Sequence, residues 1–87
     1  RGMNELVKSG LLINVATHRY YLPSQLKDVA KIVQRMAASE PLTVRGFRDE
    51  TGIGRNVAIE VLEYFDGKGF TRRQGNDRII LNLTIFD

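Results

Sequence analysis

A tight turn, a helix and a hairpin follow one another in GIGRNVAIEVLEYFDGKGFTRRQGNDRIIL, residues 52–81. The tripeptide GIG at residues 52–54 is short enough to serve only as a corner between two helices, a role that glycine tolerates best. Apolar residues then recur at helical spacing over residues 55–68 and form one stripe: Ala58, Val61, Leu62 and Phe65. Gly67 and Gly69 mark the end of this helix.

Two further helices are predicted upstream of the turn. Pro23 interrupts the preceding strand pattern, and Ser24 can cap a helix that ends near Glu40-Pro41. The apolar residues of this helix follow the i, i+3, i+4, i+7 pattern: Leu26, Val29, Ala30, Val33, Met36 and Ala37. Thr43 can cap a shorter helix that ends at Gly52.

The last hairpin is predicted over residues 70–81, with its strands closed around Gly75-Asn76, a dipeptide suited to a tight turn. For a two-residue and a four-residue loop alike, Arg73 falls opposite Arg78. Like charges directly opposite each other destabilise a sheet, so the pair indicates a place for an anion between them. Alternatively, the hairpin tip is simply solvated and Asp77 supplies the local counter-charge.

Helix, short helix, glycine turn, helix and β-hairpin is the order of a winged helix-turn-helix, an α+β fold. Residues 11–22, LLINVATHRYYL, hold a further hairpin, and residues 3–8 can form the last turns of a helix before it. We therefore expect residues 1–22 to be the tail and wing of a preceding winged helix. Residues 23–87 are then the C-terminal winged-helix domain.

Length and composition are those of one small globular domain, with 87 residues, 43% of them apolar and 26% charged. The absence of cysteine excludes disulfides and thiolate metal sites. No apolar run approaches the roughly 20 residues that span a bilayer, so we expect no membrane partner. We also expect a monomer located in the cytoplasm. Because the chain begins Arg1-Gly2-Met3, we expect a piece of a longer polypeptide. The net charge of +3 mildly favours an anionic partner.

The sequence shows no pattern of an enzyme. It has no Ser/His/Asp set, no phosphate-cradling glycine loop and no carboxylate pair with a plausible pocket. The one histidine, His18, lies in the first turn without a recognisable acid–base partner. We therefore expect a binding module that carries no catalytic residue, metal or cofactor.

The helix over residues 55–68 is predicted to dock by its end. A step of about 100° per residue places Asn56, Glu60 and Glu63 on its outward face, where the two carboxylates would repel phosphates. Its N-terminus offers free backbone N–H groups, the positive end of the helix dipole, and the side chain of Arg55 beside Gly54. The alternative is that the glycines only permit a sharp corner and Arg55 is solvated.

Two arginines of the preceding short helix lie three residues apart. Arg45 and Arg48 can brace a nucleic-acid backbone, but pairing with the neighbouring acids Asp49 or Glu50 is the interpretation we favour. They are therefore left out of the candidate site.

Residues 47–77, FRDETGIGRNVAIEVLEYFDGKGFTRRQGND, resemble the C-terminal winged-helix domain of SelB, the bacterial selenocysteine-specific translation elongation factor. The segment RYYLP, residues 19–23, and the hairpin containing it resemble the end of the family's penultimate winged helix. The resemblance implies a module that binds the selenocysteine insertion (SECIS) hairpin in mRNA and directs selenocysteine incorporation at UGA codons. GTP, selenocysteyl-tRNA and the ribosome would be bound through the parent factor, outside this segment.

The resemblance also implies which residues contact RNA. Arg55 would hold a backbone phosphate, and the wing would meet the RNA through Arg72, Arg73 and Gly75. The full set of RNA-binding candidates is Gly54, Arg55, Asn56, Arg72, Arg73, Gln74, Gly75, Asn76 and Arg78. Asn56 and Gln74 stand where the family often carries basic residues, which predicts weaker phosphate binding and a flatter salt dependence. An amide can instead bind a base edge.

Two other classes of function compete with RNA binding. One is a DNA-binding winged helix of a transcriptional regulator, which needs a helix side able to enter the major groove. Glu60 and Glu63 argue against it. The other is a winged helix used only for protein contact, in which the arginines serve solubility.

Overall fold

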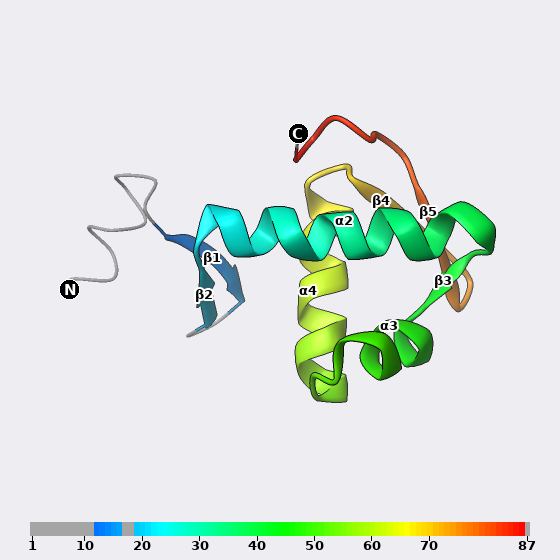
Figure 1. The fold of residues 1–87 in the computed structure, drawn as a ribbon, viewed down its shortest axis with the longest axis horizontal. Coiled ribbons are helices and arrows are strands. Elements are labelled where there is room, and N and C mark those ends of the chain that lie inside the picture. The colour runs from blue at the N-terminus through cyan, green and yellow to red at the C-terminus, as the bar shows by residue number, and fades with distance from the viewer. Residues whose placement is uncertain (1–11, 17–18, 87) are drawn as a thin grey trace.

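The computed structural model describes residues 12–16 and 19–86. Within them the chain forms three helices and two antiparallel sheets (Figure 1). The elements are β1 (Ile13–Ala16), β2 (Arg19–Tyr21), α2 (Pro23–Ser39), β3 (Leu42–Thr43), α3 (Val44–Thr51), α4 (Arg55–Gly67), β4 (Thr71–Gln74) and β5 (Asp77–Ile80). This order confirms the predicted winged helix-turn-helix. None of the described helices is long and apolar enough to cross a membrane.

The first hairpin is confirmed, since β1 and β2 pair antiparallel with Ile13 opposite Tyr21. The helix end predicted at residues 3–8, and His18, lie outside the described residues. The division of the chain at residue 22 stays a prediction.

Helix α2 begins two residues earlier than a cap at Ser24 would give. Leu22 is the N-cap residue, and its backbone N–H donates to the Gln25 side chain at 2.8 Å. The prediction that Ser24 caps the helix is wrong, because Pro23 already takes the first helical position, where its fixed φ and missing N–H are no cost. The helix ends before Glu40, as expected.

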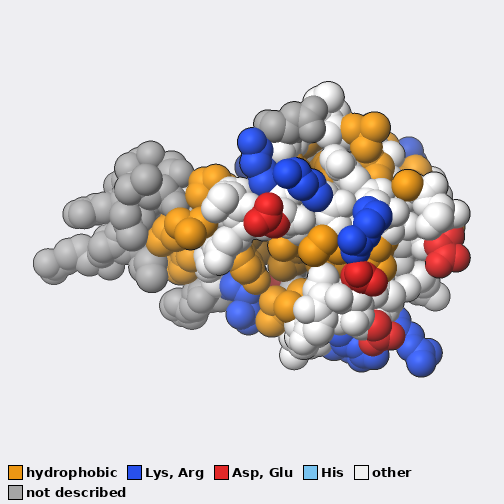
Figure 2. Space-filling view, in the orientation of Figure 1, with side chains coloured by type: hydrophobic (Ala, Val, Ile, Leu, Met, Phe, Trp, Pro, Cys, Tyr) orange, Lys and Arg blue, Asp and Glu red, His pale blue; other side chains and the backbone are white. Residues whose placement is uncertain are grey.

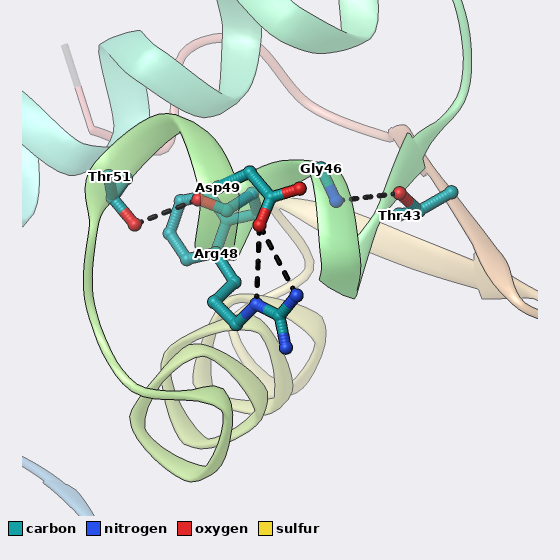
Figure 3. A network of polar contacts seen from close by, with 6 residues as sticks. Thr43, Gly46, Arg48, Asp49 and Thr51 are labelled. Carbon is teal, nitrogen blue, oxygen red and sulfur yellow. Dashed lines mark hydrogen bonds and ion pairs between the residues drawn. The ribbon is translucent and has the colours of Figure 1, made fainter.

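The corner between α3 and α4 follows the sequence signals closely. The Thr43 hydroxyl accepts a hydrogen bond from the Gly46 N–H at 2.9 Å, which confirms it as the cap of α3 (Figure 3). At the other end, Gly52 adopts a φ of 74° and donates its N–H to the Arg48 carbonyl at 2.8 Å. This left-handed conformation favours glycine and turns the chain into α4.

The second sheet has the strand order β3-β5-β4, and β4 with β5 is the wing. Gln74 pairs with Asp77, so the wing loop has two residues, with Gly75 at a φ of 64°. Strand β3 was not predicted. It ties the start of α3 to the wing, because Leu42 pairs with Arg78 and Thr43 with Asp77.

One apolar core joins the helices to the wing. Its fully buried members come from α2, β3, α3, α4 and the start of the wing: Leu26, Ala30, Val33, Leu42, Phe47, Ala58, Val61, Leu62, Phe65 and Phe70. Phe65 packs edge-on against Phe70 and Phe86, with ring centroids 5.1 Å apart in both pairs. Phe47, Phe65 and Phe70 are all fully buried, and the contact between Phe65 and Phe70 anchors the wing against α4.

Candidate nucleic-acid interface

A cavity of about 300 Å³ lies where α3, α4 and the wing meet. Its lining residues are Thr43, Val44, Arg45, Arg55, Ile59, Glu63, Arg73, Asn76 and Arg78. Four of them are arginines and one is acidic. The N-terminus of α4 and the wing were predicted to act together, and this cavity brings Arg55 from the first beside Arg73 and Asn76 from the second.

The N-terminal end of α4 is open to solvent. Gly54 is the N-cap residue, and Arg55 and Asn56 begin the helix with exposed side chains. No described residue forms an ion pair with Arg55. Because the first N–H groups of a helix lack intrahelical partners, this end presents donors, a dipole and a guanidinium together. Such an arrangement suits an anion.

In the wing, Arg73 lies directly opposite Arg78, as predicted. The two side chains nevertheless have different environments. Arg73 is exposed, and its Nε donates to the Gly75 carbonyl at 2.9 Å. Arg78 is 3% exposed, and its Nε and Nη2 lie 3.1 and 3.0 Å from Oδ2 of Asp66. The expected vacancy for an external anion between the two arginines is therefore wrong, because the chain supplies Asp66 as the counter-charge.

The remaining candidates lie outside the cavity lining but on the surface. Arg72, Gln74 and Gly75 are exposed in the wing, as are Gly54 and Asn56 at the start of α4. A Cβ added at Gly54 would meet nothing within 4 Å, so this glycine leaves open space for an approaching ligand.

The side of α4 is partly covered. Glu60 accepts from Arg19 Nε at 2.5 Å, and the first hairpin packs against the helix there. Glu60 therefore lies on the surface of α4 as predicted, but Arg19 of β2 neutralises its charge. Glu63 is exposed and lines the cavity, so it remains the acidic side chain at the site.

Helix α3 contributes Arg45, which the sequence analysis left out of the candidate site because pairing with Asp49 or Glu50 was favoured; for Arg45 that pairing is wrong. Arg48 pairs with Asp49 at 3.3 Å, as favoured (Figure 3), but Glu50 pairs with Arg35 of α2 at 2.6 Å. Arg45 forms no ion pair with any residue that the structure describes, and it lines the cavity. The missing signal was β3, which joins the start of α3 to the wing.

The face of the molecule drawn in the space-filling view carries side chains of both signs of charge (Figure 2). In the space-filling view, basic side chains gather at the lower edge, over α3, with acidic side chains beside them (Figure 2). This mixture agrees with the Arg48–Asp49 pairing in that helix. Arg45, Arg55 and Arg73 form no ion pair with any described residue, and they converge on the cavity.

Comparison with known proteins gives consistent matches. The family model described as elongation factor SelB, winged helix, matches residues 34–80. The selenocysteine-specific elongation factor of Escherichia coli K12 is 33% identical over 85 residues, which are 97% of this chain and 14% of that protein. The factor of Haemophilus influenzae is 33% identical over 81 residues, 92% of this chain and 13% of that protein. The chain thus spans a small part of the relatives it matches.

A solved structure shares the fold over most of the chain. The mRNA-binding domain of elongation factor SelB from E. coli, in complex with SECIS RNA, has a TM-score of 0.88 and 32% sequence identity to this chain. The match covers 92% of this chain and 67% of that one.

Proposed function

Because this chain belongs to the winged-helix family of elongation factor SelB, we propose that it binds the SECIS hairpin of an mRNA and so directs selenocysteine incorporation at UGA codons. The observation that carries the proposal is the convergence of Arg45, Arg55 and Arg73 on one cavity. The similar E. coli domain was solved in complex with SECIS RNA, which supports the choice of ligand.

The geometry suits a stem-loop better than a regular duplex. A-form RNA has a major groove too narrow to admit a helix, and proteins bind its loops, bulges and phosphates instead. Arg55 at the end of α4 and Arg73 in the wing approach the cavity from two elements, so together they can hold a backbone from two sides. A base splayed from the loop can stack on a guanidinium plane above the apolar wall of Val44 and Ile59.

The exposed candidates outside the cavity extend this surface. Arg72 supplies a further phosphate contact from the wing, and Gly54 and Gly75 allow the RNA backbone to come close. Asn56 and Gln74 carry amides, which bind a base edge rather than adding to the salt-dependent phosphate term. We assign Arg78 an indirect role, because its guanidinium is already paired with Asp66.

In this proposal the segment is a binding module without a reaction of its own. GTP, selenocysteyl-tRNA and the ribosome are partners of the parent factor in the cytoplasm, and the segment itself takes no cofactor. The module then tethers that factor beside the UGA codon.

Docking on duplex DNA is the weaker candidate. A winged helix that inserts its helix into a major groove needs a free and non-acidic side on that helix. On α4, the first hairpin covers Glu60 and the cavity wall carries Glu63.

A competition experiment tests the proposal. A labelled SECIS stem-loop bound to the chain is challenged with the unlabelled stem-loop or with a DNA duplex of equal length, at one salt concentration. We expect the duplex to compete at least about tenfold less well, as specific sites do over non-specific ones. Equal competition by the duplex would show that only phosphate charge is recognised.

A further inference from the structure

Three side chains meet beneath the wing. Asp66 lies in the last turn of α4, Thr71 begins β4 and Arg78 lies in β5. Oδ1 of Asp66 accepts from the Thr71 hydroxyl at 2.6 Å, and Oδ2 accepts from Arg78 Nε at 3.1 Å. Arg78 Nη2 lies 3.0 Å from the same Oδ2. One carboxylate therefore ties both strands of the wing to the end of the helix.

This cluster of three side chains is largely shielded from solvent, and its carboxylate lies where the helix dipole disfavours a negative charge. Only 4% of the Arg78 side chain and 25% of the Asp66 side chain are exposed, and Thr71 is 1% exposed. A carboxylate near the C-terminus of a helix is disfavoured by the helix dipole. Its position at Asp66 is sustained by the charge-assisted bonds to the wing, which are among the stronger hydrogen bonds in proteins.

From these contacts we infer that Asp66 is a positioning residue for RNA binding. It sets the orientation of the wing against α4 through Arg78 and Thr71, and so places Arg73 and Asn76 on the cavity that Arg55 also lines. Arg78 acts through Asp66 and is not itself a phosphate ligand. The inference rests on the proposed function and adds the element that holds the two sides of the site together.

The substitution Asp66→Asn distinguishes a positioning role from a simple charge effect, because the two predict opposite changes in RNA affinity. It raises the net charge by one beside a site for a polyanion, so electrostatics alone predicts tighter RNA binding. A positioning role predicts weaker binding, because an amide does not balance the buried guanidinium and the wing loosens. We expect the Kd for a SECIS stem-loop to rise about fivefold or more, the effect of losing one good arginine contact.

Glu63→Gln is the matched control. It removes one negative charge from the cavity wall, where no described residue pairs with Glu63. We expect the Kd to fall a few fold, because Glu63 lines the cavity and its carboxylate no longer repels the phosphates. Asp66→Asn and Glu63→Gln thus alter the net charge identically and are expected to alter affinity in opposite directions.

A double variant guards against a simple folding defect. Replacing a buried ion pair by uncharged groups of similar volume is often neutral for stability, so Asp66→Asn combined with Arg78→Met is expected to fold. Because it leaves no unpaired guanidinium, it should bind RNA better than Asp66→Asn alone and keep the wild-type salt slope. If Arg78 instead contacted a phosphate, the double variant would bind more weakly than Asp66→Asn and lose about 0.7 of a unit of slope.

Amide hydrogen exchange of β4 and β5 in the RNA-free protein is the readout that does not depend on RNA. We expect Asp66→Asn to speed exchange at the wing, with the double variant in between, while Glu63→Gln leaves it unchanged. Asp66→Asn with wild-type exchange and undiminished affinity would overturn the inference. Failure of the wild-type protein to prefer the stem-loop would overturn the proposed function instead, and the exchange data would still decide whether Asp66 positions the wing.

Discussion

The guanidinium of Arg19 in β2 contacts the carboxylate of Glu60 in α4, so a hairpin 41 residues away in sequence is fastened to the side of the helix whose end faces the cavity. Both side chains are partly exposed, at 39% and 31%. Such a pair contributes little to stability, about 0–1 kcal/mol. Its larger consequence is electrostatic, because it neutralises one of the three acidic side chains of α4, which are Glu60, Glu63 and Asp66.

The Arg19–Glu60 pair gives the first prediction. Arg19→Ala leaves Glu60 unneutralised near the RNA site and should weaken binding to a SECIS stem-loop by a few tenths of a kcal/mol, more at low salt. Glu60→Gln should not weaken it, and in that background Arg19→Ala should lose its effect. A double-mutant cycle at two salt concentrations measures this. Equal effects of Arg19→Ala in both backgrounds would mean that the hairpin does not act through Glu60.

Arg73 should be among the side chains that bind RNA directly. Its guanidinium is exposed on the cavity, so Arg73→Ala is expected to cost about 1–3 kcal/mol of binding and about 0.7 of a unit of salt slope. Arg35→Ala is the control, because Arg35 is equally charged but lies on α2, paired with Glu50, and does not line the cavity. Equal losses from the two variants, measured by fluorescence titration, would indicate a non-specific charge effect.

Arg45 is the corresponding prediction for α3. Because it lines the cavity and no described residue pairs with it, Arg45→Ala should also weaken stem-loop binding by about 1 kcal/mol or more. Arg48→Ala, in the same helix but paired with Asp49, should have a smaller effect. The reverse ranking in parallel titrations would place the RNA on another face of α3.

The two glycines of the helix corner should respond differently to serine. Gly52 has a φ of 74°, so Gly52→Ser is expected to lower the free energy of unfolding by about 1–2 kcal/mol. Gly54 has a φ of −65° and open space around it, and serine is a good N-cap residue, so Gly54→Ser should keep or slightly raise stability. Urea denaturation measures both. If Gly54→Ser nevertheless weakens RNA binding, the backbone of the ligand approaches this residue.

Local patterns in the sequence were sufficient to predict the three helices and the wing. The Thr43 cap, the Gly52 corner and the apolar stripe of α4 each depend on residues within a few positions of one another. The strand register that sets Arg73 opposite Arg78 followed from the turn dipeptide alone. These local features predicted the winged helix, which the structure confirms. They also predicted that Arg55 and the wing contribute to one site, and both line the cavity.

Contacts between distant segments could not be predicted in this way. Asp66 lies 12 residues from Arg78, so neither the burial of that arginine nor its counter-charge has a local signature. The Arg19–Glu60 pair is more distant still. Strand β3 has only two residues, too few to show the alternating pattern of a strand. Because β3 joins the start of α3 to the wing, a sequence analysis that misses it cannot predict that Arg45 lies at the cavity.

Specific recognition of an RNA stem-loop can be measured by titration. The chain is titrated with a SECIS stem-loop and with a control of the same stem and a scrambled loop, at two salt concentrations. We predict a Kd at least about tenfold lower for the SECIS stem-loop at both salts, since specificity resides in the loop. Equal affinities that fall together as salt rises would contradict the account, because they would show phosphate binding alone.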